Sequence, residues 1–222
     1  VNCGRCESVC PANAAGRMLS PRRLIQGLAG EQRREFPLKM PGSRIAEAAV
    51  ETGEQSLFTR GVVAKETVWS CTNCSACMEE CPAGIQHVEF VLDLRRHLLA
   101  EGEIDEKQAA LLEAVERNGN PYGLPSYSRS EWLLEKGVPS IEDHPEADVI
   151  YWIGCAGAYD NRAQQTVLAV VQLLQAAGIS FAILSEEKCC GEVVKRLGEE
   201  GRFQLAAMEN IEMLEMYADK LF

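Results

Sequence analysis

The sequence lacks two features that would assign it to large classes of protein. Its 222 residues contain no apolar run that approaches the length of a membrane-spanning helix. Its 33 acidic residues outnumber the 22 lysines and arginines, which gives a formal net charge of -11. Because binding to a phosphate backbone needs clustered basic residues, we expect no nucleic-acid partner. Any contact with a membrane would be made through a segment outside this sequence or through a partner subunit.

The sequence also lacks the cysteine spacing of a secreted disulfide protein or of a structural zinc site. Seven of its ten cysteines fall in two short runs, and disulfides between cysteines three apart on one loop would be strained. Structural zinc sites usually pair two C-x-x-C knuckles across a longer spacer, which neither run does. Zinc or free thiols stay the alternative to iron–sulfur clusters. Clusters and reduced thiols both indicate the cytoplasm.

The run from Cys71 to Pro82 has the spacing C-x-x-C-x-x-C-x-x-x-C-P. Bacterial ferredoxins hold a cubane [4Fe-4S] cluster with this spacing. Three thiolates at steps of three on one tight loop can meet one face of a cuboidal cluster, whereas the fourth usually ligates a different cluster. Pro82 has a fixed φ and no amide hydrogen, so it turns the chain away after the last cysteine. The run therefore predicts one cluster here and a second cysteine motif elsewhere.

The second motif lies at the start of the sequence. Residues 3–11 read C-G-R-C-E-S-V-C-P, which is the same spacing without its first cysteine. The missing cysteine would stand immediately before Val1. We therefore expect this sequence to begin one residue after a cluster ligand.

Helices are predicted around and after these motifs. Ser20 is a good N-cap, with Pro21 at the first helical position. Apolar residues recur at helical spacing from Ile85 onward, and Asp105 is placed to cap the next helix. We expect helices over residues 21–30, 43–52, 85–102, 105–118 and 130–136, and a loop or a short pair of strands over residues 59–68. His87 lies close to Cys81 in sequence. Histidine can ligate iron, but a full cysteine set is present, so we expect a surface position or a hydrogen-bonding role beside the cluster.

A change of pattern after residue 145 predicts a second domain. Residues 148–155 and 180–184 are short apolar runs typical of buried strands. The helical pattern over residues 160–177 lies between them, and strand, helix and strand in about 35 residues make a βαβ unit with parallel strands. A further amphipathic helix is expected over residues 198–216.

The predicted fold class is α+β overall, with two domains of different character. Residues 1–145 are expected to form a mainly α-helical, two-cluster ferredoxin-like domain that carries both [4Fe-4S] motifs. Residues 146–222 are expected to form a truncated α/β cysteine-rich domain.

The other three cysteines follow the two predicted strands. Cys155 follows the first strand, and Cys189-Cys190-Gly191 follows the second. Both places lie at the carboxyl edge of the sheet, where α/β proteins form their sites. Adjacent cysteines followed by glycine suggest a backbone close to a bulky group. Three cysteines are too few for a conventional four-cysteine site, so buried free thiols with a chance doublet are the alternative. We assign no catalytic residue and treat these three as candidates.

These motifs resemble a known family. Twin cluster motifs followed by a Cys…Cys-Cys-Gly domain look like the iron–sulfur subunits of the heterodisulfide-reductase-like group. That group includes the catalytic subunit of heterodisulfide reductase, the iron–sulfur subunits of glycolate oxidase and anaerobic glycerol-3-phosphate dehydrogenase, and membrane-bound electron-transfer-flavoprotein:quinone oxidoreductases. The likeness to the last branch rests on C-G-R-C (3–6), L-S-P (19–21), W-S-C-T (69–72), R-N-G-N-P (117–121), W-I-G-C-A-G (152–157) and R-L-G (196–198).

The resemblance, with the crossed ligation of two-cluster ferredoxins carried over, implies two cubane clusters that share their motifs. One cluster would be held by Cys71, Cys74, Cys77 and Cys10. The other would be held by Cys3, Cys6, Cys81 and the cysteine expected upstream of Val1.

The resemblance also bears on the third group of cysteines. In the family, a C-x-x-C pair follows the Cys-Cys-Gly by some tens of residues, and in heterodisulfide reductase the full set binds noncubane [4Fe-4S] clusters that cleave a disulfide. This sequence stops at Phe222, before such a pair. Cys155, Cys189 and Cys190 are therefore candidates for a noncubane cluster, for another metal, or for no cofactor in this piece.

The resemblance finally implies a path for electrons. A donor like electron-transfer flavoprotein would pass electrons through the cysteine-rich domain and the cubanes to a membrane quinone or a haem. A cytochrome b-type module would come from a missing N-terminal segment or a partner subunit, and the protein would lie at the cytoplasmic side of the cell membrane, peripheral as this sequence stands. The alternatives are a heterodisulfide-type reductase, an iron–sulfur subunit of a glycolate or glycerol-3-phosphate dehydrogenase, and a zinc-stabilised scaffold.

Overall fold

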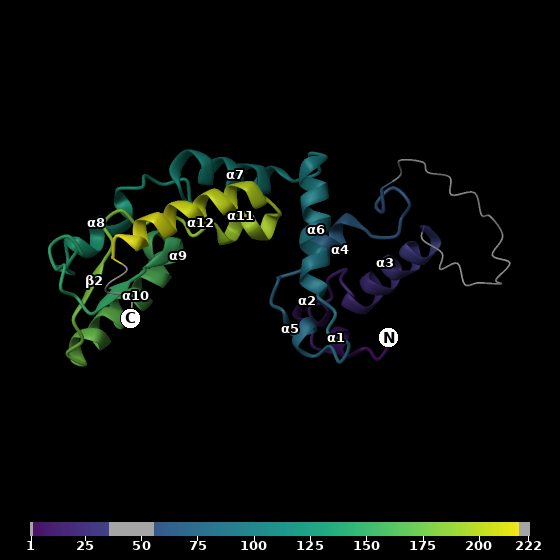
Figure 1. Cartoon of the computed structure of the whole chain (residues 1–222), viewed down its shortest axis with the longest axis horizontal. Helices are drawn as coiled ribbons and strands as arrows, with labels where there is room; N and C mark the ends of the chain where they lie inside the picture. The colour runs from purple at the N-terminus through teal and green to yellow at the C-terminus, as the bar shows by residue number, and fades with distance from the viewer. Residues whose placement is uncertain (1, 36–55, 218–222) are drawn as a thin grey trace. The chain divides into compact units, whose positions relative to one another are not determined.

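The computed structural model describes residues 2–35 and 56–217 (Figure 1). The chain divides into two compact units, Val1–His97 and Leu98–Phe222, which are described separately. The helix predicted over residues 43–52 lies outside the described residues. The domain boundary predicted near residue 145 is of another kind, because it rests on a change of sequence pattern and not on spatial contacts. It therefore stays a prediction.

The first unit is built of helices, three of which are single turns. These elements are α1 (Arg5–Ser8), α2 (Pro11–Ala14), α3 (Pro21–Glu35), α4 (Lys65–Trp69), α5 (Ala76–Glu79) and α6 (His87–Ala100), the last of which runs on into the second unit. At the start of α3, the hydroxyl of Ser20 accepts a hydrogen bond from the Arg23 amide, which confirms the predicted cap. The same hydroxyl donates to Glu7 at 2.5 Å and so ties α3 to α1.

Residues 59–64 form turns and bends, as the loop alternative predicted, whereas the rest of the stretch predicted over residues 59–68 belongs to the short helix α4. Its Val68 side chain is completely buried. Burial in a tertiary contact therefore overrides the weak strand preference of this stretch. The apolar face of α6 contributes Val88, Val91 and Leu92 to the core of this unit.

The second unit contains a small parallel sheet with helices around it. Its elements are α7 (Glu106–Asn118), α8 (Ser128–Leu134), β1 (Val149–Tyr151), α9 (Gly154–Tyr159), α10 (Asn161–Ala176), β2 (Phe181–Ile183), α11 (Glu192–Leu197) and α12 (Glu200–Glu215). Strands β1 and β2 pair in parallel, with Val149 opposite Phe181. The predicted βαβ unit and the α+β fold class are thereby confirmed, but the first strand is shorter than predicted because residues 154–159 form α9.

Caps explain where the helices of this unit begin and end. The Asp105 carboxylate accepts from the Gln108 amide and completes a capping box at the start of α7. The Asp160 carboxylate caps α10 in the same way, at 2.8 Å from the Ala163 amide. The helix predicted over residues 198–216 begins at Glu200, and a separate helix, α11, precedes it. Gly198, at φ 94°, separates the two, because this backbone region is open to glycine at little cost.

Both faces of the sheet are covered, because alternate side chains of β2 belong to two separate apolar clusters. Phe181 and Ile183 pack into one apolar cluster, which includes Val167 and Val171 of α10. Ala182 and Leu184 belong to a second cluster, against which Met213 and Leu214 of α12 pack. Successive side chains of a strand point to opposite faces, so α10 and α12 lie on opposite faces of the sheet (Figure 1).

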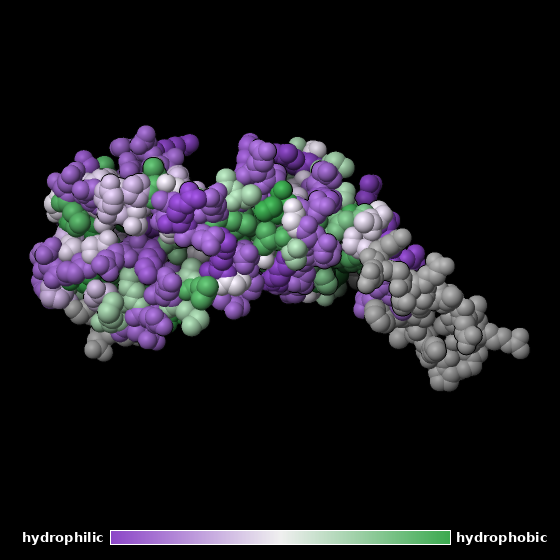
Figure 2. Space-filling view, turned by 90° about the horizontal axis from the view of Figure 1, so that it is seen from above, coloured by the Kyte–Doolittle hydropathy of each residue, from purple (hydrophilic) through white to green (hydrophobic). Residues whose placement is uncertain are grey.

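The surface is mostly hydrophilic in the view of Figure 2, in keeping with the formal charge of -11. Within residues 2–35 and 56–217, no helix combines the length and the apolar character needed to cross a bilayer.

A close contact between α9 and α10 leads to a stability prediction. A Cβ at Gly157 would lie 2.7 Å from Cγ2 of Val167. We expect Gly157→Ala to lower the free energy of unfolding by about 1–3 kcal/mol, because the added methyl overpacks a buried contact. Anaerobic urea unfolding followed by circular dichroism measures this. In the control Gly201→Ala, the nearest atom to the new Cβ is Oε1 of Glu199 at 3.6 Å, and stability should stay equal or rise by up to about 1 kcal/mol. Equal stabilities of the two variants would contradict the prediction.

Candidate metal centres

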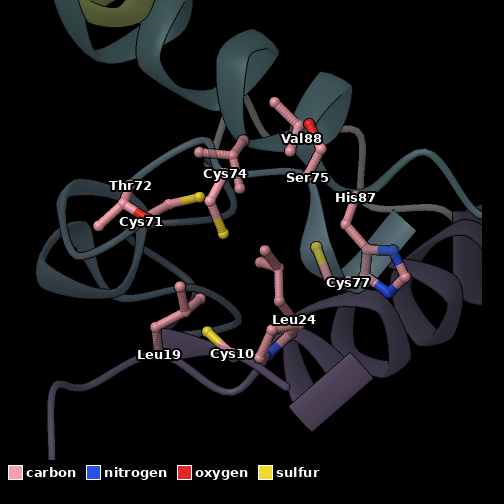
Figure 3. A pocket seen from close by; sticks show the side chains of 12 residues that line it. Cys10, Leu19, Leu24, Cys71, Thr72, Cys74, Ser75, Cys77, His87 and Val88 are labelled. Atoms are coloured by element: carbon pink, nitrogen blue, oxygen red, sulfur yellow. The ribbon is translucent and has the colours of Figure 1, made fainter. Parts of the chain in front are cut away.

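Four of the predicted ligands surround one cavity in the first unit. Figure 3 shows the side chains of Cys10, Cys71, Cys74 and Cys77 around it. Cys10 comes from the N-terminal motif and the other three from the Cys71–Pro82 run. Leu19, Leu24, Val88, Val91 and His87 are among the residues that complete the lining. The structure thus brings together thiols from both motifs, in the grouping that crossed ligation predicts.

The loop that carries Cys71 and Cys74 holds an uncommon backbone conformation. Asn73 has φ 54° and Ser75 has φ 62°, both in the left-handed region. Such residues cluster at functional sites, because the surrounding structure must hold them there at a cost of order 1–3 kcal/mol each. The Asn73 amide donates to Sγ of Cys71 at 3.4 Å. The tight winding of this loop is what turns its successive sulfurs toward one cavity.

The pKa values of these thiols follow from burial and from one another. Burial raises the pKa of Cys77 to about 11, and the neighbouring sulfurs of Cys71, Cys10 and Cys74 add to this shift. Burial is also the main cause that raises the pKa of Cys71. Buried thiols with raised pKa values, such as Cys71 and Cys77, become thiolates most readily beside a positive charge, which the irons of a bound cluster would supply.

The other three predicted ligands of the first unit also lie together. The pKa of Cys6 is raised by burial first, and then by the charges of Cys3 and Cys81. Helices α1 and α5 are in contact and bring the two motifs side by side. The Ile85 amide donates to Sγ of Cys81 at 3.4 Å. The second group therefore consists of Cys3, Cys6 and Cys81.

The donor sets can be tested for their fit to the implied cofactors. Among the described residues, no three side chains of His, Cys, Asp or Glu converge closely enough to hold a single metal ion. The sulfurs of Cys10, Cys71, Cys74 and Cys77 instead stand around a mainly apolar cavity (Figure 3). Thiolates around a cavity fit a cubane cluster, whose ligands bind separate irons at its corners.

His87 lies inside the protein and not at the surface. Its side chain is 3% exposed and lines the cavity with Cys77. Its Nδ1 lies 2.8 Å from the Ile85 carbonyl oxygen. Because a carbonyl only accepts, Nδ1 is the donor. The predicted surface position is therefore wrong, and the hydrogen-bonding alternative agrees with this geometry.

In the second unit, Cys155 lies in a network of buried charges. Arg129 of α8 donates through Nη2 to Sγ of Cys155 at 2.9 Å, and through Nη1 to Oε1 of Glu187 at 2.5 Å. Glu187 also accepts from the amides of Ile153 at 2.7 Å and Gly154 at 2.8 Å. The side chains of Arg129 and Glu187 are 2% and 0% exposed. The pair thus holds the start of α9, where Cys155 lies.

The electrostatics of this network favour a thiolate at Cys155. The hydrogen bond from Cys189 and then the guanidinium of Arg129 lower the pKa of Cys155 to about 7, against the opposing effect of burial. The same hydrogen bond, with burial, raises the pKa of Cys189. Burial raises the pKa of Glu187, and Arg129 and the two amides offset part of that shift. Cys155 and Cys189 are therefore brought together as predicted, while Cys190 is exposed.

Sequence reasoning missed both charged members of this network. Arg129 stands in an ordinary S-R-S-E-W stretch. Glu187 follows another glutamate, Glu186, which is exposed. No local pattern separates one from the other, since burial here depends on residues that are distant in sequence.

Comparison with known proteins agrees with this arrangement. Residues 1–85 match the family of 4Fe-4S dicluster domains, and residues 149–222 match the family of cysteine-rich domains with the Cys-Cys-Gly signature. The chain therefore carries a 4Fe-4S dicluster domain followed by a cysteine-rich domain, and it is similar to the heterodisulfide-reductase-like iron–sulfur proteins. The dicluster domain contains all seven cysteines of the two motifs, and the cysteine-rich domain contains the other three. The predicted [4Fe-4S] cofactors are thereby confirmed.

The relatives in this family are larger proteins. A probable membrane-anchored ferredoxin of Chromohalobacter salexigens is 39% identical over 98% of this chain and 34% of its own length. An EtfAB:quinone oxidoreductase of Syntrophomonas wolfei is 36% identical over 99% of this chain and 34% of its own length. A dihydromethanophenazine:CoB–CoM heterodisulfide reductase polypeptide of Methanosarcina barkeri is 31% identical over 97% of this chain and 51% of its own length. The chain thus spans about a third to a half of the length of these iron–sulfur relatives, which include named oxidoreductases. No solved structure matches the chain.

Proposed function

We propose that this chain is the iron–sulfur relay of an oxidoreductase that takes electrons from a flavoprotein and delivers them to a membrane quinone or a haem. The observation that carries the proposal is the enclosure of one cavity by Cys10 of the first motif and Cys71, Cys74 and Cys77 of the second. Support for the donor and the acceptor comes from relatives named EtfAB:quinone oxidoreductase and membrane-anchored ferredoxin.

The proposed ligands follow the crossed grouping of the thiols. One [4Fe-4S] cluster takes Cys10, Cys71, Cys74 and Cys77. The other takes Cys3, Cys6, Cys81 and a residue before Val1. A bound cluster of this kind supplies one-electron chemistry whose potential depends on its hydrogen bonds and its exposure.

The residues around the two groups of thiols have two tasks in this proposal. Leu19, Leu24 and Val91 exclude water, since they form the apolar wall of the cavity. The amides of Asn73 and Ile85 donate to the sulfurs of Cys71 and Cys81. Hydrogen bonds to ligand sulfur favour the more negative reduced state, so both amides raise the reduction potential.

The buried network around Cys155 supports a second candidate function. A thiolate held at 2.9 Å by Arg129 is suited to ligate a noncubane cluster that cleaves a small heterodisulfide. Cys189 and Cys190 would complete the part of that site present in this chain. One relative is named as part of a heterodisulfide reductase.

The proposed partners are a flavoprotein donor and a cytochrome b-type module in the longer protein or in a partner subunit. The proposed location is the cytoplasmic face of the cell membrane. Membranes that contain the full-length protein test both: clusters reduced by the flavoprotein should be reoxidised on addition of a quinone analogue, as followed by their visible absorption. Clusters that the analogue leaves reduced would overturn the relay, and turnover of a small heterodisulfide by the same membranes would favour the second candidate.

A further inference from the structure

A buried arginine holds the loop that leads into the second cysteine run. Arg95 of α6 is 4% exposed, although it is charged. Its Nη2 donates to the carbonyl oxygens of Val68 at 2.9 Å and Cys71 at 2.6 Å. Its Nη1 donates to Oδ1 of Asn73 at 3.2 Å. The guanidinium also lies over the ring of Trp69, 5.1 Å from its centroid.

These contacts join α6 to the backbone at Val68 and Cys71 and to the side chain of Asn73. The arginine fork spans Val68 to Asn73, and Asn73 is one of the two residues with positive φ in this loop. A left-handed asparagine is sparsely populated by itself, so surrounding contacts must hold it. Arg95 supplies such contacts from a long, regular helix, which makes the position of Cys71 dependent on α6.

The charge of Arg95 also lies beside the cluster site. Its guanidinium is bonded at 2.6 Å to the carbonyl oxygen of Cys71, which is one of the proposed ligands. Reduction of a [4Fe-4S] cluster adds one negative charge. In a buried setting, a nearby positive charge stabilises the reduced state more strongly than it would in water.

We propose that Arg95 is a positioning residue that holds the Cys71–Cys74 loop in its ligating form and raises the reduction potential of the cluster bound there. The inference rests on the ligand assignment of the proposed function, but it needs neither the donor nor the acceptor. The proposal also predicts the order in which the two clusters are reduced. Arg95 favours reduction of the cluster of Cys71, Cys74 and Cys77 before the cluster of Cys3, Cys6 and Cys81.

The test compares Arg95→Gln, which removes the charge, with Arg95→Lys, which keeps it. Each variant is made in the full-length protein and purified anaerobically, and both clusters are titrated potentiometrically with electron paramagnetic resonance. The matched control is Arg96→Gln, because Arg96 neighbours Arg95 on α6 but pairs with Asp93 at the surface. The cluster under test is identified as the one that Cys77→Ser removes.

We expect Arg95→Gln to lower the reduction potential of that cluster alone. A smaller fraction of that cluster should then be reduced at a given applied potential. Arg95→Lys should restore most of the potential, and Arg96→Gln should change neither cluster. Loss of that single cluster in both Arg95 variants would support the positioning role, because lysine keeps the charge but lacks the fork that holds the loop. Unchanged potentials, equal shifts in both clusters, or loss of both clusters would overturn the proposal. Failure of the quinone experiment would leave these potentials measurable, so the two tests are separable.

Discussion

Replacing Cys10 or Cys77 by serine is expected to remove the same cluster, although the two residues belong to different motifs. Both thiols line one cavity, and serine is a poor ligand for iron–sulfur clusters. Iron should fall from about eight to about four atoms per full-length chain. Anaerobic purification, iron and sulfide counts and electron paramagnetic resonance measure this, and the surviving signal should be identical in the two variants.

The reciprocal substitutions complete this experiment. Cys6→Ser and Cys81→Ser should remove the other cluster, because Cys6 and Cys81 lie together with Cys3 in the second group of thiols. The control is Cys190→Ser, which changes an exposed cysteine of the other unit and should leave both cubane signals in place. If Cys10→Ser removed the signal that Cys6→Ser removes, the ligation would follow the sequence motifs and the crossed assignment would be wrong. Zinc in place of iron would end the cluster proposal.

Replacing Glu187 by glutamine is expected to destabilise the second unit by about 3–5 kcal/mol, because it leaves the guanidinium of Arg129 buried without its carboxylate. The carboxylate also accepts from the amides of Ile153 and Gly154, and an amide side chain offers only one oxygen for those bonds and a misplaced donor. Anaerobic urea unfolding followed by far-ultraviolet circular dichroism measures the loss.

The neighbouring residue provides the control for this prediction. Glu186 is exposed, so Glu186→Gln should change the stability by no more than about 0.5 kcal/mol. The double substitution Arg129→Met with Glu187→Met should recover part of the lost stability, since it leaves no unpaired buried charge. It should also raise the pKa of Cys155, because the guanidinium that helps to lower it is gone. Equal stability of the Glu187 and Glu186 variants would show that the ion pair is not needed for folding.

Local chemistry explains why much of the architecture was predictable. The predicted caps at Ser20 and Asp105 use side chains that satisfy free amides three residues further on. The βαβ unit follows from two apolar runs around a helical repeat. Burial against distant residues was not predictable: residues 65–69 form a helix whose Val68 is fully buried, and α9 contains the last residues of the predicted first strand.

The sequence by itself determined the type of cofactor, because the spacing C-x-x-C-x-x-C-x-x-x-C-P limits the geometry that three neighbouring thiolates can adopt. Only the tertiary structure decided which thiols share a cavity and which charges are buried beside them. Arg95 and Arg96, like Glu186 and Glu187, are adjacent and chemically alike, yet one of each pair is buried and the other lies at the surface. That difference depends on contacts with residues far away in sequence, such as Val68 for Arg95 and Arg129 for Glu187, and such contacts exist only after the chain has folded.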